Sequence, residues 1–132
     1  MTTPHGFAPT LDDIEAIARQ ALADLPPVFQ TYLPDVVLKV EDFPSEEVQR
    51  DMELESPFDI LGLYHGHDVS RSVEVSGALP DTVYLYRRPL LDYWAEHEET
   101  LAHLVAHVLI HEIGHHFGMS DDDMHGLEDQ TD

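Results

Sequence analysis

The 132-residue chain contains no cysteine and few basic residues. Without thiols it can form neither disulfides nor thiolate metal sites, so His, Asp and Glu are the only strong metal ligands that it has. Its 27 acidic residues against 6 Lys plus Arg give a formal net charge of −21. A phosphate backbone or an anionic membrane surface would repel such a protein. We therefore expect neither nucleic acid nor a membrane as a partner.

Long apolar runs are also missing. No run approaches the roughly 20 residues that span a bilayer, and the start of the chain has neither the basic nor the apolar region of a signal peptide. These absences predict a soluble, cytoplasmic protein. The length and the 42% hydrophobic content suit a single domain over residues 1–132, with an acidic tail that frays after about residue 125.

The distribution of apolar residues predicts both helices and strands. From Leu11 to Leu25 apolar residues recur every three or four positions, after Thr10 as a cap and before Pro26-Pro27 as a stop, which indicates a helix. The other expected elements are strands over residues 35–41 and 82–86, a short helix from Ser45, a loop or hairpin over 62–68, an edge strand over 71–75 and a long helix over about 97–117.

The long helix carries the pattern H-E-x-x-H at residues 111–115. Two imidazoles four residues apart project from one face of a helix and can reach the same metal ion at about 2.0–2.1 Å. Glu112 lies about 100° around the helix from His111, so its carboxylate can flank the metal and accept a proton from a bound water. The pattern predicts a zinc site with His111 and His115 as ligands and Glu112 as general base.

A third protein ligand has to come from beyond the two histidines. A continuous helix would carry residue 121 about 15 Å along the axis from residue 111, so the helix must end before a shared site can form. Gly118 can adopt the left-handed conformation that ends a helix and turns the chain back. Asp121 is the predicted third ligand, and His125 and Glu128 are the alternatives.

These residues resemble a known signature. The pattern H-E-x-x-H-x-x-G-x-x-D over residues 111–121 resembles the metzincin zinc motif, with Asp where His is usual. The chain from Leu61-Gly62-Leu63-Tyr64 through residues 85–90 to 111–118 resembles the small bacterial family of minimal zincin-like metallopeptidases. Unlike metzincins, which have a longer region with a Met-turn, the chain has only eleven residues after Asp121. Met124 is the residue that could take the place of that turn.

The resemblance implies a fold and a function. The implied fold is a compact α+β domain, in which a long metal-binding helix lies beside a small mixed sheet with one or two further helices. The implied function is zinc-dependent hydrolysis of a peptide or protein substrate, with Glu112 moving a proton from water to the leaving amine. By analogy with zincins, the strand over residues 83–86 is expected to be the edge strand to which the substrate adds.

Two alternatives remain open for the function. One is a zinc-binding interaction module that has the same fold but no turnover. Glu112 and the lack of an obvious fourth ligand favour the enzyme over this module, because structural zinc sites usually have four protein ligands. The other alternative is an acidic interaction protein whose histidines only mimic the motif.

Further histidines and tyrosines have simpler explanations. His103 and His107 continue the four-residue spacing but suit solvated helix positions, and His116 could donate to a carboxylate or pack beside its neighbour. The remaining candidates are His65 and His67, which suit a polar loop, and Tyr64, Tyr84 and Tyr86, which could serve as oxyanion donors.

Overall fold

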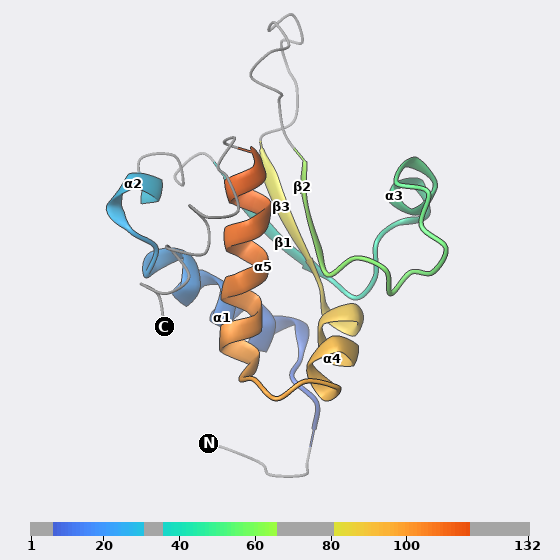
Figure 1. Cartoon of the computed structure of the whole chain (residues 1–132), viewed down its shortest axis with the longest axis horizontal. Helices are drawn as coiled ribbons and strands as arrows, with labels where there is room; N and C mark the ends of the chain where they lie inside the picture. The colour runs from blue at the N-terminus through green and yellow to red at the C-terminus, as the bar shows by residue number, and fades with distance from the viewer. Residues whose placement is uncertain (1–6, 31–35, 66–80, 117–132) are drawn as a thin grey trace, which may run out of the picture.

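The computed structural model describes residues 7–30, 36–65 and 81–116, which form helices and a small sheet (Figure 1). The predictions for residues 71–75 and for the tail after about residue 125 lie outside the described residues. The elements are α1 (Leu11–Ala23), α2 (Pro27–Gln30), β1 (Val37–Glu41), α3 (Glu46–Asp51), β2 (Gly62–His65), β3 (Thr82–Tyr86), α4 (Arg87–Ala95) and α5 (Leu101–His116). The α+β class with a small mixed sheet is confirmed.

The helix α1 begins at a reciprocal cap. The Oγ1 atom of Thr10 accepts a hydrogen bond from the Asp13 N–H at 3.1 Å, and Asp13 Oδ2 accepts one from the Thr10 N–H at 2.9 Å. Both bonds satisfy N–H groups that the first turn of a helix leaves without an intrahelical acceptor. The helix predicted from residue 11 is confirmed, although it ends at Ala23.

The sheet has β3 at its centre. Its strand order is β1-β3-β2, with β1 parallel and β2 antiparallel to β3. The strand predicted over residues 82–86 is confirmed, but the expectation that it is the substrate-aligning edge is wrong. Both hydrogen-bonding edges of β3 are occupied, and Pro89 lies in α4, where it interrupts no ladder bond. Within the described residues, β2 is the edge strand on the side of α5.

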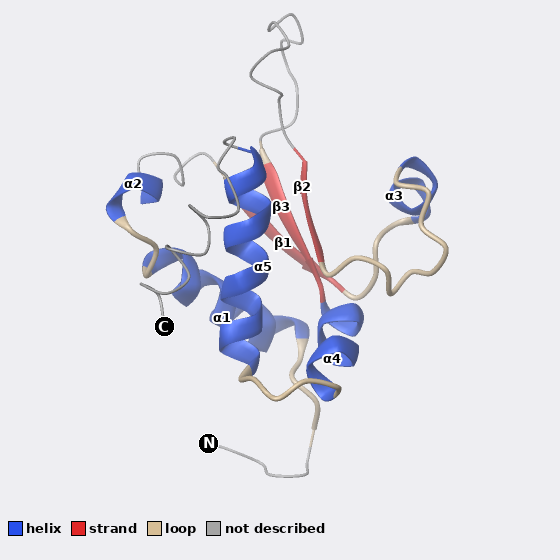
Figure 2. Ribbon diagram, in the orientation of Figure 1, coloured by secondary structure: helices blue, strands red, loops and turns tan. Residues whose placement is uncertain are grey.

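One face of the sheet is covered by α1 and α5 (Figure 2). The helix α1 packs against β1 and α5, and α5 packs against β2 and β3. Each fully buried Leu, Ile or Val in this layer contributes roughly 1.5–3 kcal/mol, so the layer is the main source of stability. Its core consists of Ile14, Ala18, Leu38, Val83, Leu85, Leu90, Leu101, Leu104, Val105, Val108 and Leu109.

The helix α4 follows β3 directly, and no helix was predicted at this position from the sequence. Its first residue, Arg87, donates from Nε to the Pro9 carbonyl at 2.6 Å and from Nη1 to Asp42 Oδ1 at 3.1 Å. Pro89 stands in the first turn, where a missing N–H breaks no intrahelical bond. In the sequence Pro89 suggests the end of a strand, whereas in the structure it belongs to the first turn of α4.

A short loop over residues 96–100 connects α4 to α5. The Trp94 indole donates to the Glu99 carbonyl at 2.9 Å, and the His103 N–H donates to Thr100 Oγ1 at 3.0 Å. Thr100 therefore caps the long helix, which begins at Leu101 and not at about residue 97.

The segment between β1 and β2 stands away from the sheet and carries α3 (Figure 1). The Leu54 N–H donates to the Gln49 carbonyl at 2.9 Å, and the Glu53 N–H donates to the Arg50 carbonyl at 3.1 Å. This pair of bonds is a Schellman motif, which places one residue in the left-handed region. That residue is Glu53, with φ of 54°.

Replacing Glu53 by Gly is expected to raise the free energy of unfolding by about 1 kcal/mol, because glycine enters the left-handed region without a Cβ clash. Urea denaturation would measure the change. Glu53→Ala is the matched control, since it removes the charge and keeps the Cβ. If the Gly variant is no more stable than the Ala variant, the strain at this position is negligible.

Candidate functional site

The helix α5 carries the H-E-x-x-H pattern in its second half, and the prediction that this pattern is helical is confirmed. The four-residue spacing places His111 and His115 one turn apart on the same side of the helix. The helix is anchored in the domain by its buried apolar residues, which are Leu101, Leu104, Val105, Val108, Leu109, Ile110 and Ile113. Core packing therefore sets the orientation of the motif.

His111 belongs to a stripe of histidines along α5. It is half-buried, and its Nε2 atom is buried. Its ring centroid lies 4.3 Å from that of His107, with the planes tilted by 37°. One turn earlier, His103 Nδ1 lies 2.8 Å from Glu99 Oε2. His103 and His107, expected at solvated positions, are both partly buried and contact Glu99 and His111 respectively.

Glu112 is half-buried on α5, next to His111. Its charge acts on the buried tyrosine at the end of β3. The pKa of Tyr86 is raised above its ordinary value, chiefly by burial and then by the charges of Glu41, Tyr84 and Glu112. The carboxylate predicted as general base therefore lies in the electrostatic range of the sheet that α5 covers.

The other predicted ligands lie beyond what the structure describes. His115 is in the last turn of α5, but its side chain is outside the described part. Asp121 and its alternatives, His125 and Glu128, also lie outside the described residues. Among the residues described, no group of three or more His, Asp or Glu is placed to hold a metal ion. The ligand set therefore stays a prediction.

The edge strand β2 lies directly against α5. A Cβ atom added to Gly62 would stand 2.8 Å from Val108 Cγ1 and 2.9 Å from the Tyr84 carbonyl oxygen, so only glycine fits. Because Val108 is one turn before His111, this contact brings β2 beside the half of α5 that carries the motif. The sequence reading of residues 62–68 as a loop or hairpin missed this role of Gly62.

Of the three candidate tyrosines, Tyr64 is on the side of the sheet that faces α5. It pairs with Val83 of the core, and its hydroxyl oxygen is buried. Burial, then the charge of Asp81 and a hydrogen bond with it, raise the pKa of Tyr64. Tyr84 stacks on Tyr86, with centroids 6.2 Å apart, and alternation along β3 places both on the opposite side from Val83.

A helix with the H-E-x-x-H pattern beside a small mixed sheet defines a zincin-like domain. A family model described as zincin-like metallopeptidase matches residues 33–131, which include the whole sheet and α5. The chain belongs to the zincin-like metallopeptidase family. Membership implies a divalent metal, typically zinc, and a peptide or protein substrate. The match begins after α1 and α2.

A search of curated proteins found no match to the chain. None of the helices in the described segments is long and apolar enough to cross a membrane.

Replacing Gly62 by Ala should lower the free energy of unfolding by about 1–3 kcal/mol, because the methyl group overpacks the contact between β2 and α5. Urea denaturation of Gly62→Ala, Val108→Ala and the double variant would test this. Removing the Val108 methyls relieves one of the two clashes, so the double variant should lose less stability than the sum of the single losses. Strict additivity would show that the two residues are not in contact.

Raised pKa values at Tyr64 and Tyr86 predict a loss of stability in alkali. Above about pH 10 the unfolded chain releases these phenolic protons while the folded chain keeps them, so folding is favoured less as pH rises. The contribution of these two protonated tyrosines to the free energy of unfolding is fully present below about pH 10. Denaturation between about pH 9 and 11 should show a smaller decline for Tyr64→Phe than for the wild type. Tyr93→Phe, at an exposed tyrosine, is the control and should decline as the wild type does.

Proposed function

We propose that the protein is a zinc-dependent peptidase in which His111, His115 and Asp121 bind the metal and Glu112 is the general base. The observation that supports this most directly is the packing of α5. Its H-E-x-x-H half lies beside an edge strand, where Gly62 allows the backbone of β2 to approach the helix. A metal-binding helix next to an open strand edge is suited to a peptide substrate.

The donor set fits the proposed metal. Imidazole nitrogen and carboxylate oxygen are good zinc ligands, and three protein ligands leave a coordination position open for catalysis. The His111 ring is held by the helix and by His107, and its Nε2 atom is withdrawn from bulk solvent. When bound, zinc would polarise the scissile carbonyl and lower the pKa of water.

Glu112 would perform the proton transfers. It is adjacent to His111 on α5 and is half-buried, so that its carboxylate is neither fully solvated nor enclosed in the core. In the proposed reaction it accepts the proton of the attacking water and passes it to the nitrogen of the departing amine. Both transfers use the same carboxyl group, which is restored at the end of the cycle.

The substrate would bind in extended form along β2. This strand pairs with β3 on one side, and the described residues place no strand on its other side. Main-chain hydrogen bonds to that edge would align a peptide parallel or antiparallel to β2, beside the second half of α5. This assignment replaces the expectation for the strand over residues 83–86, because β3 has no free edge.

Elemental analysis of the purified protein tests the metal site. The wild type and Glu112→Gln should each contain about one zinc, because Glu112 flanks the metal without binding it. His111→Ala and His115→Ala should contain little zinc. His65→Ala, at the exposed end of β2, is the matched histidine control and should keep it. A wild type that takes up no zinc, even when zinc is supplied, would contradict the proposal.

A peptide library tests the chemistry with the same variants. The wild type should cleave at least one peptide, and Glu112→Gln should do so about 10²–10⁴ times more slowly, because the general base is lost. Stoichiometric zinc without cleavage of any peptide would favour the zinc-binding module instead. Equal rates in wild type and Glu112→Gln would exclude Glu112 as the base.

A further inference from the structure

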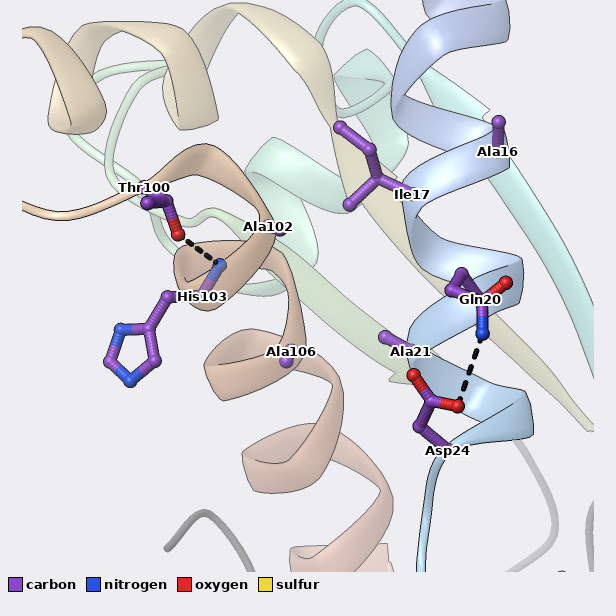
Figure 3. Close-up of a pocket in the computed structure, with 9 residues that line it drawn as sticks. All are labelled: Ala16, Ile17, Gln20, Ala21, Asp24, Thr100, Ala102, His103 and Ala106. Carbon is purple, nitrogen blue, oxygen red and sulfur yellow. Dashed lines mark hydrogen bonds between the residues drawn. The ribbon is translucent and has the colours of Figure 1, made fainter. Parts of the chain in front are cut away.

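A cavity of about 510 Å³ opens between α1 and the first half of α5 (Figure 3). Its apolar lining comes from both helices and consists of Ala16, Ile17, Ala21, Ala102 and Ala106. We call it the α1–α5 groove. It lies on the part of α5 that precedes the H-E-x-x-H pattern, and α1 precedes the segment that matches the zincin-like family. The groove is therefore a feature separate from the proposed peptidase site.

The groove is open because alanines face it from both helices. Each helix also has larger side chains that are buried in the core, such as Ile14 on α1 and Val108 on α5. Ala16 and Ala102 are exposed, so the apolar lining is accessible from solvent. Short side chains at these positions leave space in which the side chains of another helix can sit between α1 and α5.

The charges around the groove are predominantly acidic. Asp24 lines it at the end of α1, where it accepts a hydrogen bond from Gln20 at 3.1 Å, as Figure 3 shows. Glu98 and Glu99 precede α5 at the other end. The one basic residue of α1, Arg19, forms an ion pair with Glu15 at 2.9 Å. A cationic partner would therefore gain from long-range attraction as well as from local pairing.

We propose that the α1–α5 groove binds a cationic amphipathic helix of another protein. The apolar stripe of such a helix would fill the alanine-lined space, and Lys or Arg beside the stripe would lie near the acidic ends of the groove. A second copy of the chain is disfavoured because each copy carries a net charge of −21. The chain's own residues 117–132 are acidic and contain no Lys or Arg, which disfavours them as occupants too.

Fluorescence anisotropy can test this with the full chain and a synthetic probe. The probe is a fluorescein-labelled helical peptide of about five turns, with Leu and Ala on one face and Lys on the other. At physiological ionic strength the wild type should bind it, and Ala102→Trp, which fills the groove at an exposed position, should weaken binding at least about tenfold. Ala95→Trp, at an exposed alanine of α4, is the matched control and should bind as the wild type does.

Two further measurements make the test decisive. A peptide with the same apolar face and Glu in place of Lys should not bind, and thermal melting should show that both Trp variants fold. Equal binding of the Lys peptide by the wild type and Ala102→Trp would mean that the peptide is attracted to any acidic surface, and it would overturn the proposal. A wild type that does not bind the Lys peptide would overturn it as well. Sedimentation that shows a wild-type dimer broken by Ala102→Trp would assign the groove to a second copy instead.

Discussion

The packing of α5 against the sheet is the interaction on which the rest of the structure depends. Its apolar side is buried over almost the whole helix, so the helix cannot rotate without exposing core residues to water. This constraint sets the direction in which His111 and Glu112 project. The contact of Gly62 with Val108 then sets how near the edge strand comes to the helix. The peptidase site that we propose, between α5 and the edge of β2, depends on both contacts.

The scarcity of basic residues shapes the rest of the surface. Two of the few arginines make local contacts. Arg87 donates hydrogen bonds from α4 to the Pro9 carbonyl and to Asp42, and Arg88 lies over the Phe43 ring, 5.6 Å from its centroid. Few cations remain to neutralise the acidic surface, so the protein carries a strong negative field. Such a field favours cationic ligands wherever the surface also offers an apolar cavity, and the α1–α5 groove combines the two.

Several elements could be predicted because their signals are local. The cap at Thr10, the alternating residues of β3 and the apolar side of α5 all act within a few positions along the chain. The helix α4 escaped prediction because Pro89 suggests the end of a strand as readily as the first turn of a helix. The edge strand was misassigned because strand order depends on pairing between segments far apart in sequence, which periodicity does not report.

By itself, the sequence determined the family of the chain and the helix that carries the H-E-x-x-H pattern, because residues four apart lie on the same face of any helix. It also determined the charge of the surface, which composition alone sets. Only the tertiary structure decided which strand forms the edge beside α5 and why residue 62 must be glycine, because both follow from contacts across the core. The α1–α5 groove also belongs to the tertiary structure, since its alanines come together only when two distant helices pack.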